Sequence, residues 1–294
     1  MTAFRIKNWT REDHPIRGDI VRFKSMIGRR IFNIHEDLLC TSSEYFRKTF
    51  QGNRKPIEGD CSICYHKLKS KAEDVTFCRY GCGQNLHKSC LDTWTSTKTS
   101  PKCPMCRKDW IETSTEAHLL FAEIQDSTIQ LYVNWLYRGF FPETEDATPI
   151  HQNNEAWLQY HQLLVKAWEL SSKLQAKDFA DLVVGRIIES MDSEHGANLE
   201  DVCIESAYGV NGTSEMRRLA VNLFLVDTDA HYIVGTAARH PKEFFVDLSV
   251  ELLGRAGRPA TFADVTERYF EGEFEDSEDS EDNGDDDDDD EMDD

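Results

Sequence analysis

Apolar and polar residues alternate in two short runs near the start of this chain. The runs IVRFKS (residues 20–25) and RRIFNIH (residues 29–35) flank Gly28, and this arrangement predicts a β-hairpin. The stretches HEDLLC (35–40) and SEYFRKTF (43–50) follow, and their spacing predicts two helices. The pattern therefore predicts a small unit that combines strands and helices.

The apolar positions return with a helical period after residue 126. Ser127 or Thr128 is expected to cap a helix that Gly139 ends, and Asp178 is expected to cap a later one. The same period predicts helices at residues 157–168, 178–191, 213–227 and 241–254. The second half of the chain is therefore expected to be helical.

Between these two periodic regions the chain is rich in cysteine. It has nine cysteines, and only Cys40 and Cys203 lie outside the stretch from Cys61 to Cys106. The N-terminus has no basic-then-apolar signal region, so export is not expected. In a chain that is not exported, such clustering favours zinc over disulfides.

The spacing of these cysteines, together with one histidine, is that of a two-zinc module. Two-residue spacings let one turn present two thiolates to one ion, and zinc takes four such ligands. The eight candidate ligands are Cys61, Cys64, Cys78, Cys82, His87, Cys90, Cys103 and Cys106. Fewer than about fifty residues cannot build a sufficient core, so metal binding is expected to supply the folding free energy. Spacing alone leaves both sequential and interleaved pairing of the ligands open.

The residues between the ligands resemble those of RING domains of ubiquitin ligases over residues 58–110. Ile63 lies between the first two ligands, Trp94 follows the sixth, Pro104 follows the seventh and Arg107 follows the eighth. The resemblance implies that the first three form a shallow apolar groove for a ubiquitin-conjugating enzyme. It implies that Arg107 bonds both ubiquitin and its carrier, and that no residue forms a covalent intermediate.

The RING resemblance also implies an interleaved pairing of the two ligand sets. One zinc ion is then held by Cys61, Cys64, His87 and Cys90. The other is held by Cys78, Cys82, Cys103 and Cys106. PHD fingers, some of which read histone tails, share this ligand order. They usually place an aromatic residue two positions before the seventh ligand, where this chain has Pro101.

The regions on either side of the zinc module resemble two parts of one BTB/POZ domain. The upstream match is GDIVRF…FNIHEDLL…SSEYFRKTF, and the downstream match begins at STIQLYVNWLYRGFF. The expected class is α+β, a BTB/POZ fold interrupted by a RING domain. The expected parts are residues 1–57 (first BTB part), 58–110 (RING), 111–191 (second BTB part), 192–260 (helical extension) and 271–294 (disordered acidic tail).

These resemblances imply two different functions. The first is a ubiquitin ligase whose partners are a conjugating enzyme and ubiquitin, with the BTB part serving dimerisation or recruitment. The second is a non-enzymatic adaptor that binds a cullin or self-associates, with the zinc module as a structural or protein-binding insert. The combination of Ile63, Trp94, Pro104 and Arg107 favours the ligase, because a purely structural insert does not need all four.

Charge narrows the range of partners. The net charge is −21, but residues 271–294 hold 17 acidic and no basic residues, so the remainder is close to balance. Such a stretch is expected to be disordered, and it disfavours nucleic-acid binding through long-range attraction. No apolar run approaches the ~20 residues of a membrane span. A cytoplasmic or nuclear location is therefore expected.

Overall fold

The structure is a computed structural model. It describes residues 16, 19–25, 27–28, 30–69, 74–111, 118–119, 124–139, 154–191, 199–209, 212–227, 233, 235, 237–254 and 261. The predicted disordered stretch, residues 271–294, lies outside these ranges. Along the part of the chain that is described, no helix is both long and apolar enough to cross a membrane.

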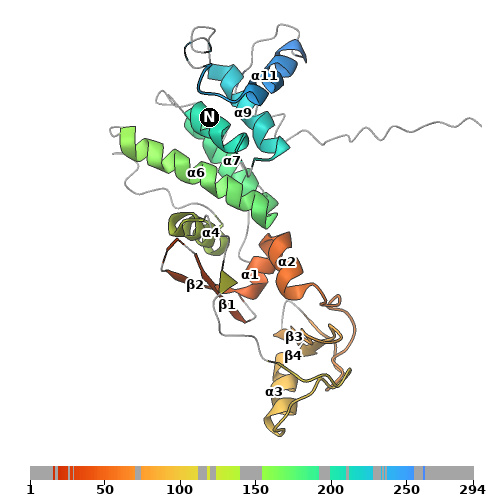
Figure 1. Ribbon diagram of the computed structural model, residues 1–294. Coiled ribbons are helices and arrows are strands. Elements are labelled where there is room, and N and C mark those ends of the chain that lie inside the picture. Colours follow the sequence, from red (N-terminus) through yellow and green to blue (C-terminus); the bar gives the residue numbers. More distant parts are fainter. Residues whose placement is uncertain are drawn as a thin grey trace, which may run out of the picture.

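A three-stranded sheet lies at one end of the body, as the parts outside the zinc module are called here (Figure 1). Strands β1 (Ile20–Lys24) and β2 (Ile31–His35) form the predicted antiparallel hairpin, and β5 (His118–Leu119) pairs in parallel with the other edge of β1. The alternation in β1 and β2 buries Val21 and Phe23 from the first strand and Phe32 and Ile34 from the second. The hairpin prediction is confirmed (Figure 1).

The turn of the hairpin is held against the start of α4 (Asp126–Arg138). The Gly28 backbone N–H donates to Ser25 Oγ at 2.6 Å, and Ser25 Oγ donates to Asp126 Oδ1 at 2.7 Å. A Cβ atom at position 28 would lie 2.0 Å from Asp126 Oδ2. A larger residue at this position would therefore displace the Asp126 carboxylate from its hydrogen bond with Ser25.

Helices α1 (Glu36–Ser42) and α2 (Glu44–Gln51) follow the hairpin, as the sequence predicts. Ser43 separates them: its Oγ accepts the Phe46 backbone N–H and donates to Leu174 O at 2.5 Å. Phe46 is only 1% exposed, so α2 packs its aromatic face into the body. The two helices connect β2 to the zinc module.

Helix α4 ends at Gly139, whose φ of 76° is typical of a left-handed helix cap, as predicted. The predicted N-terminal cap is wrong. The cap position is Gln125, with no side-chain cap, and Ser127 and Thr128 lie within the first turn. Thr128 is buried there, so its hydroxyl serves packing inside the helix rather than the cap.

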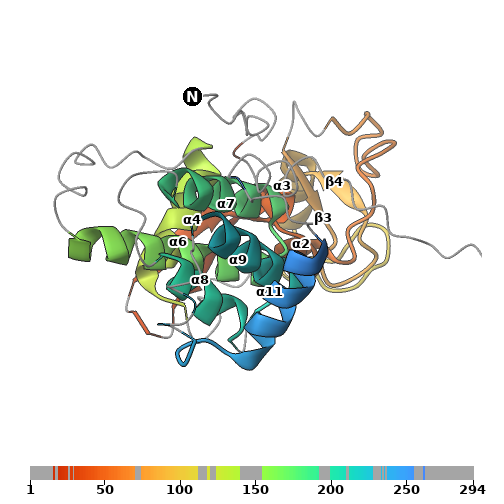
Figure 2. The ribbon, with the colours of Figure 1, turned by 90° about the horizontal axis from the view of Figure 1, so that it is seen from above.

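The remaining helices stack beyond α4. They are α6 (Asn154–Leu174), α7 (Lys177–Met191), α8 (Leu199–Ala207), α9 (Ser214–Asp227) and α11 (Lys242–Gly254). Helix α6 contacts α4, α7 and α8, and α9 contacts both α8 and α11 (Figures 1 and 2). Asp178 is the second residue of α7 and not its cap, since the helix already begins at Lys177.

The described residues form two separate hydrophobic cores. The large core joins the sheet to the helices of the body, from α1 and α2 to α11 but without α3, and includes Trp135, Trp168 and Phe179. The small core lies within the zinc module, and its buried members are Cys61, Leu68, Leu86 and Leu91. Four buried side chains and six partly buried ones form a core too small to offset the entropy of ordering the module, so we expect its stability to depend on metal.

Candidate metal centre

The zinc module contains a short hairpin followed by one helix. Strands β3 (Val75–Phe77) and β4 (Asn85–His87) pair antiparallel, and α3 (Lys88–Ser96) begins directly after β4. His87 therefore stands at the junction of strand and helix, one turn before Cys90. Leu86 and Leu91 point into the small core and fix this junction.

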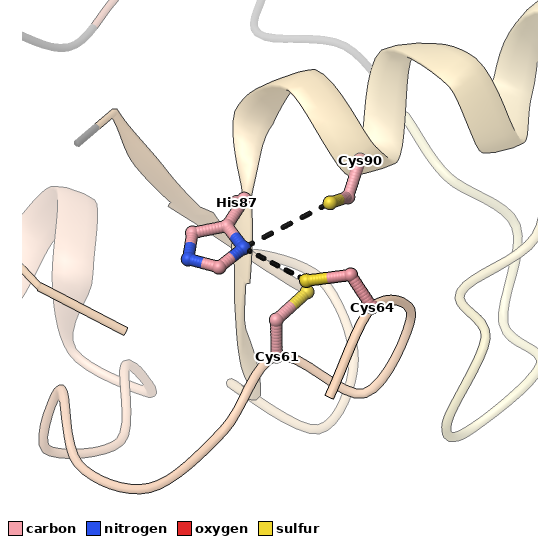
Figure 3. Close-up of side chains that lie close together, drawn as sticks. All are labelled: Cys61, Cys64, His87 and Cys90. Atoms are coloured by element: carbon pink, nitrogen blue, oxygen red, sulfur yellow. Dashed lines mark hydrogen bonds between the residues drawn. The ribbon is translucent and has the colours of Figure 1, made fainter. Parts of the chain in front are cut away.

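The first candidate site consists of Cys61, Cys64, His87 and Cys90, whose ligand atoms lie within 4.8 Å of one another. His87 Nδ1 is 3.3 Å from Cys64 Sγ and 3.8 Å from Cys90 Sγ, and the three sulfurs converge on this nitrogen (Figure 3). In a tetrahedral zinc site, bond lengths of roughly 2.0 and 2.3 Å separate nitrogen and sulfur by about 3.6 Å. The spacing therefore fits zinc.

The second candidate site consists of Cys78, Cys82, Cys103 and Cys106. Cys78 Sγ lies 3.7 Å from Cys106 Sγ, and Cys82 Sγ lies 3.9 Å from Cys103 Sγ. Four thiolates on a tetrahedral zinc ion are separated by about 3.8 Å, which both distances approach. The ligands of the two sites alternate along the chain in pairs, so the interleaved pairing is present and the sequential one is not.

Two tight turns of the same design present ligands to the two sites. In the first, Cys61 N donates to His66 O and Tyr65 N donates to Cys61 O. In the second, Cys103 N donates to Lys108 O and Arg107 N donates to Cys103 O. The residue after the second cysteine has a φ of 60° at Tyr65 and 61° at Arg107.

In each turn, backbone N–H groups favour ionisation of one cysteine, and the thiolate is the form that binds zinc. The backbone N–H of Lys108 lowers the pKa of the Cys106 thiol to about 6. Burial opposes ionisation of Cys61, but N–H groups of Cys64, His87 and Ile63 outweigh it and lower the pKa of its thiol to about 7. Burial raises the pKa of the thiols of Cys78, Cys90 and Cys103, so the backbone favours the thiolate at only some of the ligands. The match to a thiophilic metal therefore rests on the donor set and its spacing.

A groove lies beside the first site, on the surface of α3. It has a volume of about 470 Å³ and is lined by Ile63, Ser89, Cys90, Thr93, Trp94, Thr97 and Lys98. Ile63 is half-buried and Trp94 is 36% exposed, so both remain accessible. The Trp94 indole Nε1 donates to Lys102 O at 3.0 Å, and Lys98 Nζ lies 3.1 Å from the centre of its ring. These contacts hold the indole in one orientation.

The other two predicted contact residues lie near the second site. Pro104 is half-buried in the turn between Cys103 and Cys106, and it is not among the residues that line the groove. Arg107 is exposed on the same turn. The structure therefore brings Ile63 and Trp94 together and places Pro104 and Arg107 on the neighbouring turn.

Sequence reasoning missed the rest of the groove wall. Cys90, Thr93, Trp94 and Thr97 are spaced as one face of a helix. That spacing, applied forward from Trp94, would have identified Thr97 and Lys98 as neighbours of the tryptophan. Threonine and lysine are common on exposed surfaces, so neither residue type indicates a groove in the sequence.

Comparisons with known proteins place the resemblance in the same region. The Ring finger domain family matches residues 59–107. The human E3 ubiquitin-protein ligase ZSWIM2 is 43% identical over 64 residues, which cover 19% of this chain and 10% of that protein. The mouse protein of the same name is 39% identical over 57 residues, covering 17% and 9%. No solved structure matches.

These matches cover only the zinc module. The chain spans about a tenth of the length of the curated relatives that it matches. The matched region contains all eight candidate ligands, which the structure gathers into two alternating groups of four. Residues 59–107 are therefore a RING-type zinc finger with two interleaved sites, each suited to one zinc ion.

Proposed function

We propose that this protein is a RING-type ubiquitin ligase, in which the zinc module binds a ubiquitin-conjugating enzyme and promotes transfer of ubiquitin to lysines. The observation that carries this proposal is the open groove formed by Ile63 and Trp94 beside the first zinc site. An exposed tryptophan with apolar and small polar neighbours has the composition of an interface hot spot. The matched segments of proteins named as ubiquitin ligases support the same function.

The chemistry proposed for the module is orientation. The conjugating enzyme already carries ubiquitin as a thioester, and a ligase of this kind holds the thioester in a geometry that a lysine amine can attack. Arg107 is exposed on the turn next to the groove, where its guanidinium can donate to two carbonyl groups at once. No residue of the chain needs to form a covalent bond with ubiquitin.

The body is proposed to be a BTB/POZ-like domain that dimerises or recruits partners, among them a cullin. The hairpin β1–β2, the helices α1 and α2, and a parallel strand β5 on β1 support this assignment. The module emerges between α2 and β5, an exposed connection where insertion of a folded domain is tolerated. Residues 192–260 are proposed to extend the body by further helices.

The test of ligase function is discharge of ubiquitin from a panel of charged conjugating enzymes onto free lysine. Wild type is compared with Ile63→Ala and Trp94→Ala, and Ile27→Ala serves as a matched control because Ile27 is exposed on the hairpin, outside the groove. Hot-spot residues contribute about 2 kcal/mol or more, so each groove variant is expected to lower the rate about 30-fold.

The control is expected to leave the rate unchanged. If zinc-loaded wild type is inert with every conjugating enzyme, the ligase proposal fails and the non-enzymatic adaptor takes its place. If wild type is active but Trp94→Ala loses nothing, the groove is not the binding surface.

A further inference from the structure

The chain that enters the zinc module is in contact with it throughout, rather than serving as a loose linker. Asn53 Nδ2 donates to Arg79 O at 2.5 Å and to Gly81 O at 3.4 Å, and Lys55 N donates to Gly83 O at 3.0 Å. A Cβ atom at position 83 would lie 1.8 Å from Asn53 O. The backbone of the second zinc site therefore packs directly on the segment that follows α2.

Arg54, in this entering segment, bonds the module and the body simultaneously. Its Nε donates to Asn85 Oδ1 at 3.0 Å and its Nη2 donates to Val75 O at 3.1 Å, both in the module's hairpin. Its Nη1 lies 3.8 Å from Asp37 Oδ1 on α1. The Arg54 side chain is only 12% exposed, so its two hydrogen bonds to the hairpin are shielded from water, whereas the ion pair is only partly shielded because the Asp37 side chain is 36% exposed.

Arg79, in the module, makes the reciprocal connection. Its Nη2 donates to Glu36 Oε2 at 2.7 Å, and its Nη1 donates to Phe50 O at 2.5 Å, where α2 ends. The side chains of Arg79 and Glu36 are 17% and 4% exposed. Burial raises the pKa of the Glu36 carboxyl, and the Arg79 guanidinium opposes that rise.

Phe77 lies between the two arginines. Its ring centre is 5.0 Å from the Arg54 guanidinium carbon and 4.9 Å from that of Arg79, and the residue is 4% exposed. Cation–π contacts of this kind strengthen when they are removed from water. Glu36, Asp37, Arg54, Phe77 and Arg79 are called the junction cluster below.

The junction cluster leaves the module with one stable orientation. Buried charge pairs depend strictly on geometry, and loss of one partner leaves the other charge uncompensated. Gln51 Nε2 also donates to Glu36 Oε1 and Asp37 Oδ1, but it carries no charge. A rotated module would therefore leave the buried Glu36 carboxylate without the Arg79 guanidinium, its ion-pair partner. In Figure 1 the module, with α3 at its far end, extends from the end of α2 on the side opposite to α9 and α11.

We propose that the junction cluster fixes the direction in which the zinc module presents a charged conjugating enzyme relative to the body. Arg79 and Glu36 are then positioning residues that determine which lysines receive ubiquitin, although neither touches the reacting atoms. The inference rests on the proposed ligase function and adds that the fixed orientation of the module determines which lysines are within reach. The targets concerned are lysines of the body itself and lysines of a protein that the body holds.

The test compares Arg79→Met with Arg47→Met. Arg47 pairs with Glu44 on the exposed surface of α2, so its loss removes the same charge without touching the junction. Both variants are expected to discharge ubiquitin onto free lysine within twofold of wild type. Site-resolved mass spectrometry of self-ubiquitination is expected to show the major site of Arg79→Met falling at least fivefold, with ubiquitin spread over other lysines. Arg79→Lys is expected to restore part of the wild-type pattern.

Trypsin provides a second measurement that does not depend on ubiquitin. Cleavage after Arg54 requires the cluster to open, so Arg79→Met is expected to be cut at least tenfold faster there than wild type or Arg47→Met. Zinc is measured on each variant, and if Arg79→Met holds fewer than two ions, Glu36→Gln replaces it.

An unchanged site pattern together with an unchanged cleavage rate would overturn the inference. A fast cleavage rate with an unchanged site pattern would overturn the positioning role alone. An inert wild type would overturn the ligase function, and the cleavage rate would then decide by itself whether the junction is fixed.

Discussion

Tyr65 and Arg107 occupy the same position in the two zinc-binding turns, with φ values of 60° and 61°. Each follows the second cysteine of its turn, and each donates its backbone N–H to the carbonyl oxygen of the first. A left-handed backbone costs a residue with a side chain about 1 kcal/mol, while glycine adopts it freely. The backbone of each turn would therefore favour glycine. Tyr65 and Arg107 are present either because their side chains have a function or because this small cost is tolerated.

Replacement of Arg107 by glycine is expected to separate stability from function. Arg107→Gly relieves the left-handed backbone, so the melting temperature of the zinc-loaded protein should stay equal or rise. Loss of the guanidinium removes charge-assisted hydrogen bonds of about 1.5–3 kcal/mol, so ubiquitin discharge should fall at least about tenfold. Thermal denaturation and discharge onto free lysine measure the two effects.

Tyr65→Gly is the matched control, since it makes the same backbone change on the other turn. Tyr65 is 80% exposed and does not line the groove. The Tyr65→Gly variant should gain the same stability as Arg107→Gly and should discharge ubiquitin at the wild-type rate. Equal activity in both glycine variants would show that Arg107 has no part in transfer.

Removal of zinc is expected to unfold the module while the body stays folded. The two cores are separate, so a chelator should release two ions per chain and leave the circular dichroism of the body helices largely intact. Without zinc, the module would be a flexible loop of roughly 65 residues between α2 and β5. Closing such a loop costs more entropy than closing the short gap between the ends of a folded module, so the free energy of unfolding of the body should fall by about 2 kcal/mol.

Calorimetry and a zinc assay on the same sample test this prediction. Loss of all helical signal on chelation would mean that the body depends on the module for folding. Fewer than two ions in the untreated protein would contradict the assignment of eight ligands.

Asp181 on α7 is expected to make stability depend on pH. Burial raises the pKa of its carboxyl to about 6, with Lys177 opposing the rise. Because the folded-state pKa lies above the unfolded one, the favourable contribution of the protonated form is complete below about pH 4 and is lost as pH rises through 6. At neutral pH the ionised, half-buried group is therefore destabilising.

Asp181→Asn should raise the free energy of unfolding at pH 7.5 by about 1 kcal/mol, after allowance for solvent screening of a partly exposed group. At pH 4 the two proteins should converge. Denaturant melts at the two pH values provide the comparison. If Asp181→Asn raised the free energy of unfolding equally at both pH values, the effect would come from the amide group and not from removal of the charge.

The zinc ligands could be predicted from the sequence because metal geometry is encoded in short spacings. Cys61 and Cys64, or Cys103 and Cys106, belong to one turn whatever the rest of the chain does. Their interleaved pairing was available only through resemblance, since spacing leaves both pairings open. The hairpin of β1 and β2 was likewise predictable, because alternation and Gly28 are local signals.

The junction cluster could not be predicted. Glu36 and Arg79 are 43 residues apart, and each lies in a stretch that suggests an exposed charge. A carboxylate in the first turn of a helix is ordinarily solvated, and nothing near it in sequence indicates burial. The start of α4 was misjudged for a similar reason, since Asp126 is engaged by Ser25 from a distant turn.

The parallel pairing of β1 and β5 shows how little the body needs the zinc module for its own architecture. Helices α1 and α2 already complete the crossover between these two strands, so a shorter relative could run from α2 into β5 and keep every hydrogen bond of the sheet. The zinc module therefore occupies a connection that the sheet does not need for its own pairing.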